Sequence, residues 1–179
     1  MRTSEVVNRI MFDYESMSPE EIETLAEKLP RKLKRWIAIN HPDNRTRLPF
    51  YRMTNVSIGK DTVVNQFMVV SDDYEPLVRL GDRVAVSPNV SIIAASAPNN
   101  SRLNDVPEVK DRLICQKPVV VEDDVWIGTG AILLPGIKVG ARSIIAAGAV
   151  VSKDIPPDSV AAGTPARVTR KTGMYEYAS

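Results

Sequence analysis

The stretch between residues 121 and 151 reads VEDDVWIGTGAILLPGIKVGARSIIAAGAVV, and it decides the fold. An aliphatic residue stands at every sixth position: Val121, Ile127, Leu133, Val139, Ile145 and Val151. An amphipathic helix would place apolar residues three and four apart, and a half-buried strand would alternate them with polar ones. A period of six fits neither pattern, but it is typical of a solenoid in which each hexapeptide is one short parallel strand and a turn. We therefore predict a β-solenoid with these aliphatic residues in a narrow core.

The same period occurs upstream in two shorter runs, which are Ile58, Val64, Val70 and then Leu80, Val86, Ile92. The register breaks at residues 71–79 and again between Ala97 and Pro118. Insertions in a repeat array form loops on one face, often the binding face. A loop of about twenty residues in a compact domain is uncommon and usually functional or disordered. We predict that the loop 97–118 protrudes from the solenoid as an arm.

Glycine follows four of the periodic aliphatic residues, at Gly59, Gly81, Gly128 and Gly140. A sharp corner often needs a positive φ, which glycine adopts without steric cost. We therefore expect these glycines to form corners of the coil with positive φ.

The composition excludes several classes of protein. The chain has 179 residues, 44% hydrophobic and 25% charged, with a net charge of +1. This suits one main globular domain with an appendage and offers no long-range attraction to nucleic acid. The basic residues between 28 and 47 are interpreted as a solvated helix face rather than a site for an anionic partner. No apolar run approaches the ~18 residues of a membrane span, and we expect neither a span nor a signal segment.

The chain has a single cysteine, Cys115. One cysteine excludes an intrachain disulfide framework and favours a cytoplasmic location, where thiols stay reduced. Cys115 is a poor candidate nucleophile, because the only histidine, His41, is distant in the sequence.

Residues 1–50 lack the hexapeptide pattern and predict a small helical cap. Ser18, Pro19 and Glu21 form a capping signature, so a helix should begin there and continue to about residue 29. A second helix is expected at residues 31–39. Such a cap would cover the strand edges of the first coil. The chain is thus divided into a cap at 1–50, a β-solenoid at 51–170 and a tail at 171–179, whose Met174–Tyr177 segment is a candidate to cover a neighbouring surface.

Four segments of this chain resemble the hexapeptide-repeat acyltransferases, and within them the galactoside and maltose sugar O-acetyltransferases. They are residues 124–131, 134–140, 147–157 and 161–167. The resemblance covers roughly residues 55–170 and implies a mainly β fold, a left-handed parallel β-helix of triangular section. General rules do not predict this handedness, because parallel crossovers are right-handed in ~98% of cases. The resemblance also implies a homotrimer, with active sites between subunits and acetyl-CoA along the groove.

The resemblance assigns the acetyl-CoA contacts, from the thioester to the nucleotide, to Trp126, Thr129, Ala147, Ser152, Lys153, Arg167 and Arg170. The two arginines suit the nucleotide phosphates, because a guanidinium binds phosphate oxygens through two parallel hydrogen bonds. Trp126 has a competing interpretation as a core or interface aromatic residue. No metal is expected.

On the acceptor side, Asn65 and Asp73 match positions that line the sugar pocket in this family. Asn65 follows the inward Val64, so its side chain is expected to point out of the coil. Asp73 lies in the short break of the repeat, where a loop can carry a carboxylate to a sugar hydroxyl. Its competing interpretation is a turn-forming aspartate.

The expected catalytic base is missing. In this family the base is a histidine followed by proline, and the matching stretch at residues 93–102 reads IAASAPNNSR. Ala97 stands at the position of the histidine and cannot accept the proton that a hydroxyl must lose during transfer. His41 lies far away in the helical region and is interpreted as a cap or turn residue before Pro42.

Three explanations of Ala97 stay open. The chain is an inactivated form of an ordinary acetyltransferase, which the otherwise intact site favours; or a natural protein uses Asp73 or a water instead; or the fold was kept and catalysis lost. The leading function is O-acetylation of a sugar or glycan by acetyl-CoA. The alternatives are N-acetylation of an amino sugar, whose amine needs less help from a base, and a catalytically dead trimer that binds CoA or sugar. A carbonic anhydrase of the same fold is excluded, because its metal needs three histidines.

Overall fold

The protein is described by a computed structural model for residues 2–173. Its main body contains three sheets of short strands. Face 1 comprises β1 (Val56–Ile58), β4 (Val78–Leu80), β9 (Val119–Val121) and β12 (Lys138–Val139). Face 2 comprises β2 (Val63–Val64), β5 (Ala85–Val86), β10 (Trp126–Ile127), β13 (Ile144–Ile145), β15 (Ser159–Ala162) and β16 (Arg167–Lys171). Face 3 comprises β3 (Val69–Ser71), β6 (Ser91–Ile93), β11 (Ile132–Leu133) and β14 (Val150–Val151).

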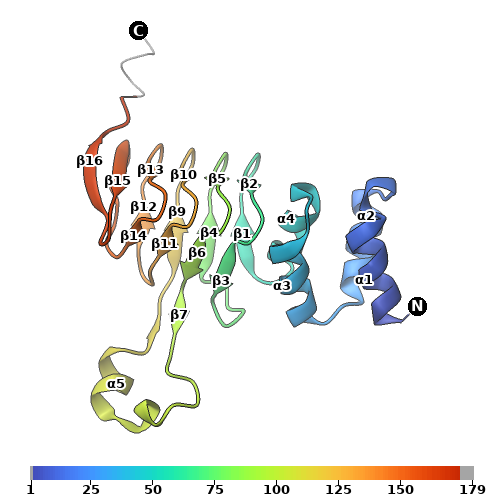
Figure 1. The fold of residues 1–179 in the computed structure, drawn as a ribbon, viewed down its shortest axis with the longest axis horizontal. Coiled ribbons are helices and arrows are strands. Elements are labelled where there is room, and N and C mark those ends of the chain that lie inside the picture. Colours follow the sequence, from blue (N-terminus) through green and yellow to red (C-terminus); the bar gives the residue numbers. More distant parts are fainter. Residues whose placement is uncertain (1, 174–179) are drawn as a thin grey trace.

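Successive strands visit face 1, face 2 and face 3 in turn, so the chain winds as a three-faced coil (Figure 1). Pairing is parallel throughout the three faces except between β15 and β16, which are antiparallel. In the later coils each residue pairs with the one three hexapeptides further on, as Trp126 does with Ile144. The predicted arrangement of parallel strands is confirmed, and the left-handed sense stays a prediction.

The periodic aliphatic residues form the core, as predicted. Leu133, Val139 and Ile145 are fully buried, and the other periodic aliphatic residues are at most 1% exposed except Ile58 and Val70 of the first coil, at 9%. A second inward position, two residues earlier in each hexapeptide, was not predicted: it holds Val119, Val125, Ala131, Ile137, Ser143 and Ala149. Each hexapeptide therefore contributes two inward side chains.

The prediction that the glycines after the periodic aliphatic residues have positive φ was wrong. Positive φ recurs at the third residue after the periodic aliphatic one, as at Asp124 (59°) and Gly130 (69°), whereas Gly128 and Gly140 do not have it. Gly128 instead lies against the next coil, where an added Cβ would be 2.5 Å from the backbone nitrogen of Ala147. Close approach between coils, rather than backbone conformation, excludes a side chain at this position.

The N-terminal region contains α1 (Thr3–Phe12), a 3-10 turn η1 (Tyr14–Ser16), α2 (Pro19–Glu27), α3 (Arg31–Asn40) and α4 (Asn44–Arg52). The capping box predicted before α2 is confirmed, since Ser18 Oγ accepts from the Glu21 amide over 3.2 Å and Glu21 Oε2 accepts from the Ser18 amide over 2.8 Å. The helix at α3 is confirmed as well, whereas α1 and α4 were not predicted. Within residues 2–173, every helix is too short or too polar to cross a membrane.

Three arginines of the helical region bind the open edge of the first coil, one on each face. Arg52 Nη2 donates to the carbonyl of Ile58 over 3.0 Å, Arg47 Nε to that of Val64 over 2.9 Å, and Arg35 Nη1 to that of Val70 over 3.1 Å. In later coils the equivalent carbonyl accepts from the amide of the preceding coil, as Val86 does from Asn65 over 2.9 Å. The arginine side chains therefore supply the hydrogen-bond donors that a preceding coil would otherwise supply.

This arrangement corrects the interpretation of the basic residues between 28 and 47. Two of them, Arg35 and Arg47, are only 6% and 3% exposed, whereas Lys28, Arg31, Lys32 and Arg45 are exposed as expected. The guanidinium groups of Arg35 and Arg47 satisfy carbonyls that would otherwise be buried without partners.

The long insertion begins and ends with a short antiparallel pair, β7 (Ala95–Ser96) and β8 (Cys115–Gln116). Between them lie a 3-10 turn η2 (Arg102–Asp105) and the helix α5 (Pro107–Arg112). Figure 1 shows this arm extending away from the coil beyond β7. The predicted tail segment Met174–Tyr177 lies outside the described residues.

Candidate functional site

The residues proposed for the donor lie mainly along face 2 and the corner that follows it. Thr129 and Ala147 stand at this corner in successive coils, and the Gly148 amide donates to the Thr129 carbonyl over 2.9 Å. Trp126 is an outward residue of β10 and is 54% exposed, with its Nε1 donating to Ser87 Oγ over 3.3 Å. This exposure excludes a role for Trp126 in the core of the chain.

Asn65 occupies the same corner at the first coil. Its side chain is exposed, as predicted, and its Nδ2 donates to the carbonyl of Val86 over 2.9 Å. This bond ties the amide to the second coil and limits the directions in which its oxygen can point.

Asp73 and Ala97 lie together at the other corner, which follows face 3. Both line a pocket of about 340 Å³, whose remaining lining residues are Ser71, Ile93, Ala95, Ser96 and Asn99. Ser71 Oγ donates to the Ala95 carbonyl over 2.8 Å and joins the two walls. The structure thus brings together two residues that are distant in the sequence.

Ser152 and Lys153 directly follow β14, so they share the face 3 corner two coils beyond the Ala97 arm. Both are exposed. Arg167 and Arg170 are exposed residues of β16 at the far end of the coil, and Arg167 Nη1 donates to the Ala166 carbonyl over 2.8 Å. The candidate residues of a single chain are therefore distributed over two corners.

Asp73 has the backbone of a corner residue, with a φ of 51°, and its side chain is exposed. It is the third residue after Val70, the position at which positive φ recurs, so the turn-forming interpretation describes its backbone. The neighbouring Asp72 is only 2% exposed and pairs with Arg35 over 3.1 Å. The sequence does not predict this pair, because nothing local separates two adjacent aspartates.

His41 cannot substitute for the missing base. It is fully buried immediately after α3, its Nε2 donates to the Ile10 carbonyl over 2.9 Å, and its Nδ1 accepts from the Asp43 amide over 3.1 Å. Burial lowers the pKa of this imidazole, only partly opposed by the hydrogen bond to Ile10. His41 is therefore a neutral structural residue, in agreement with its interpretation as a cap or turn histidine.

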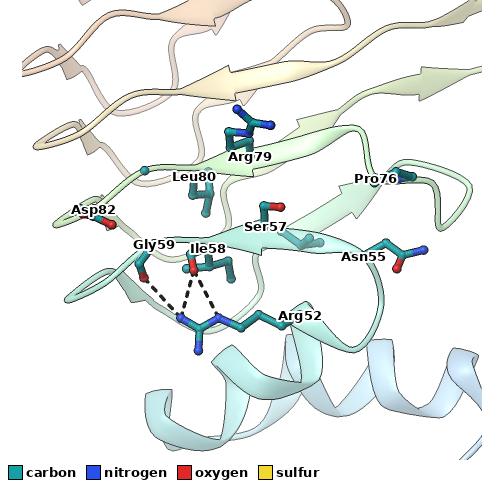
Figure 2. Close-up of a pocket in the computed structure, with 11 residues that line it drawn as sticks. Arg52, Asn55, Ser57, Ile58, Gly59, Pro76, Arg79, Leu80 and Asp82 are labelled. Carbon is teal, nitrogen blue, oxygen red and sulfur yellow. Dashed lines mark hydrogen bonds between the residues drawn. The ribbon is translucent and has the colours of Figure 1, made fainter.

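A larger hollow, about 720 Å³, lies elsewhere, over β1 and β4 on face 1 (Figure 2). It contains none of the predicted site residues. Arg52, which borders it, already donates to the carbonyls of Ile58 and Gly59, as Figure 2 shows. Size alone therefore does not identify the functional site.

The outward rows of the three faces differ in character. The row on face 2 is entirely apolar: Val63, Ala85, Trp126, Ile144 and Val160. The row on face 3 is mostly apolar: Val69, Ser91, Ile132 and Val150. The row on face 1 holds Ser57, Arg79, Val120 and Lys138. Among residues 2–173 no three histidine, cysteine or acidic side chains are grouped to hold a metal.

Comparison with known proteins gives consistent similarities. The family described as bacterial transferase hexapeptide (six repeats) matches residues 118–153. Galactoside O-acetyltransferase of Escherichia coli strain K12 is 32% identical over 164 residues, covering 90% of this chain and 75% of that protein. A hexapeptide-repeat acetyltransferase of Vibrio cholerae, solved with acetyl coenzyme A, superposes with a TM-score of 0.62 at 29% identity, covering 84% of this chain and 88% of that one. A maltose O-acetyltransferase of Clostridium difficile 630 gives a TM-score of 0.54 at 30% identity, covering 79% and 83%.

Proposed function

This chain belongs to the hexapeptide-repeat acetyltransferases, and we propose that it transfers an acetyl group from acetyl-CoA to a hydroxyl of a sugar or glycan. The observation that carries the proposal is the similarity to a galactoside O-acetyltransferase, which extends over 90% of the chain. The similarity therefore includes both the helical region and the coil, whereas a shared hexapeptide repeat alone would be confined to the coil.

We assign donor binding to the face 2 corner and the end of the coil. Trp126 and Thr129 would lie near the pantetheine arm and the thioester. Ala147 would lie further along the groove, together with Ser152 and Lys153, which belong to the face 3 corner. Arg167 and Arg170 are exposed on β16 and would bind the phosphates. These exposed side chains suit an extended, polyanionic co-substrate.

A homotrimer would bring the two corners together. The apolar outward row of face 2, with Val63 and Trp126 both well exposed, is the kind of patch that is usually buried in an assembly. A repeated head-to-tail contact closes into a ring, and it would place the corner of Thr129 beside the neighbouring copy's pocket of Asp73 and Ala97. A cytoplasmic location, expected from the single cysteine, belongs to the same proposal.

On the acceptor side, Asn65 and Asp73 would orient the sugar. Asp73 is the one ionisable side chain among the residues that line the pocket with Ala97. General acid–base assistance is typically worth ~10²–10⁴ in rate, so a site with alanine at this position should retain slow transfer through proximity alone.

The pocket of Asp73 and Ala97 also favours a second candidate, N-acetylation of an amino sugar. A carboxylate without a neighbouring base pairs well with an ammonium group and can orient it. An ammonium group loses its proton far more readily than a hydroxyl does, and the resulting neutral amine is already a nucleophile, so this reaction depends less on the residue at position 97. A catalytically dead trimer that binds CoA or sugar would keep the same geometry without turnover.

The test is release of the CoA thiol from acetyl-CoA, detected with a thiol-reactive dye, with maltose, methyl galactoside and glucosamine as acceptors. The chain is compared with its Ala97→His variant. A hydroxyl acceptor whose rate rises by orders of magnitude with histidine supports O-acetylation. Turnover of glucosamine alone, independent of histidine, supports N-acetylation, and no turnover by either protein with any acceptor contradicts both.

A further inference from the structure

We propose that Arg35 and Asp72 form a positioning pair that holds Asp73 in the acceptor pocket, an inference that rests on the proposed function of that pocket. Arg35 belongs to α3, whereas Asp72 and Asp73 lie in the turn after β3. The two members of the pair are buried, and Asp73 is exposed beside them. The helical region would thus act on the site as well as cover the coil.

Every nitrogen of the Arg35 guanidinium has a partner. Nη1 and Nη2 donate to the two carboxylate oxygens of Asp72 over 3.3 and 3.1 Å, which is a bidentate arrangement. Nη1 also donates to the Val70 carbonyl over 3.1 Å, and Nε and Nη2 donate to Thr54 over 2.8 and 2.7 Å. The guanidinium group therefore fixes Asp72 relative to β3 and to Thr54, which follows the last helix of the helical region.

The Asp72 carboxylate also binds the backbone of Tyr74, the residue after Asp73. Asp72 Oδ1 accepts from the Tyr74 amide over 3.0 Å, and Asn55 Nδ2 donates to the Tyr74 carbonyl. The Tyr74 ring lies 4.5 Å from the Arg31 guanidinium and 5.1 Å from that of Arg35, within the range of cation–π attraction. Both neighbours of Asp73 are consequently held by the helical region.

The backbone of this turn needs such support. Asp73 has the positive φ that recurs at the corners, 51°, but Tyr74 directly after it adds a second one, 60°, which the other described corners do not have. Positive φ is uncommon for residues other than glycine, and for a bulky one such as tyrosine it is a marked outlier. Such conformations persist when surrounding contacts over-determine them. The Arg35–Asp72 pair supplies these contacts, so the direction in which Asp73 leaves the turn depends on it.

The test compares acceptor kinetics of Asp72→Asn and Arg35→Met in the Ala97→His background, with the panel acceptor that gives the highest rate. Misplacement of a substrate-positioning group by about 1 Å can lower the reaction rate by ~10²-fold. We expect Asp72→Asn to lower kcat/KM for the acceptor by ~10–100-fold, with the KM for acetyl-CoA unchanged. In a chain that already carries Asp73→Asn, the same change should add little, because Asp72 acts through Asp73.

An equal further loss in the Asp73→Asn background would overturn the proposal, as would a matching rise in the KM for acetyl-CoA. Asp124→Asn is the control, since it breaks the Arg83–Asp124 pair at the corner between faces 1 and 2 and should leave acceptor KM unchanged. Arg35→Met removes a buried network and is used only if it unfolds at a temperature close to that of the parent.

Hydrogen exchange tests the pair without turnover. The Tyr74 amide donates to Asp72 Oδ1, so residues 71–77 should exchange faster in Asp72→Ala, which has no side-chain acceptor, while residues 91–96 across the pocket stay unchanged. Unchanged exchange at residues 71–77 overturns the proposal whatever the kinetics show. If exchange is faster but none of the chains acetylates any acceptor, the Arg35–Asp72 pair does hold the turn. The proposed acetyl transfer is then rejected instead.

Discussion

Arg47 Nε donates a hydrogen bond to the carbonyl of Val64 over 2.9 Å, from a side chain that is almost completely buried. The same guanidinium also donates to the carbonyls of His41 and Pro42. One residue therefore closes the edge of face 2 and holds the turn between α3 and α4. Loss of this group would leave several buried carbonyl oxygens without donors.

We accordingly expect Arg47→Met to lower the free energy of unfolding by about 3 kcal/mol, the cost of orphaned buried polar groups. Urea unfolding followed by circular dichroism measures the change. Arg45→Met, on the exposed side of the same helix, is the control and should change stability by less than about 0.5 kcal/mol. Equal effects from the two substitutions would contradict the role of Arg47.

Gly128 and Gly130 form a matched pair for testing contact between coils. A methyl group at Gly128 would meet the backbone of the next coil at 2.5 Å, whereas at Gly130, with φ of 69°, nothing lies within 4 Å. We expect Gly130→Ala to cost about 1–2 kcal/mol through its backbone conformation. Gly128→Ala should cost more than about 3 kcal/mol, or prevent folding, because backbone must move. If Gly130→Ala is the worse of the two in urea unfolding, the steric account is wrong.

The buried His41 predicts a loss of stability on acidification. Burial lowers its folded-state pKa below the ordinary value of 6.5, so the unfolded chain binds a proton that the folded chain rejects. The stability that depends on a neutral His41 is fully present above pH 6.5. It declines as the pH falls from 6.5 towards the folded-state pKa of the imidazole. The lowered pKa values of Glu122, Asp124 and Asp158 act at lower pH, since their ordinary values are 4.5 and 3.8. Unfolding free energies at pH 7.5 and 5.5 should differ less in His41→Gln than in the parent chain, and an identical difference would exclude this role.

The Ala97→His variant should acquire a pH dependence that the parent chain lacks. A general base must be unprotonated, so the rate of hydroxyl acetylation in the variant should rise with pH and level off above an apparent pKa near 6.5. The measurement is kcat/KM for the acceptor between pH 5 and 8.5. A variant with a raised rate but a flat profile would show that the histidine assists without acting as the base.

The repeat was predictable because its cause is local. One of the two inward positions of each hexapeptide always holds an aliphatic residue, so a period of six is visible in the three runs between Ile58 and Val151. The second inward row was harder to recognise, since it mixes Ile137 with Ser143 and Ala149. The candidate site residues were assigned from the resemblance to a family. Most of them lie at two corners of the three-faced coil, because each position of a hexapeptide falls at a fixed place on that coil.

The sequence by itself determined the period, the hydrophobic core and the capping box of α2. Only the tertiary structure decided that Asp72 is the buried aspartate and Asp73 the exposed one, and that Arg35 and Arg47 bind strand edges instead of facing solvent. The reason is physical. Periodic burial repeats within six residues, whereas Arg35 and Asp72 are 37 positions apart and meet only after the helices fold back onto the first coil.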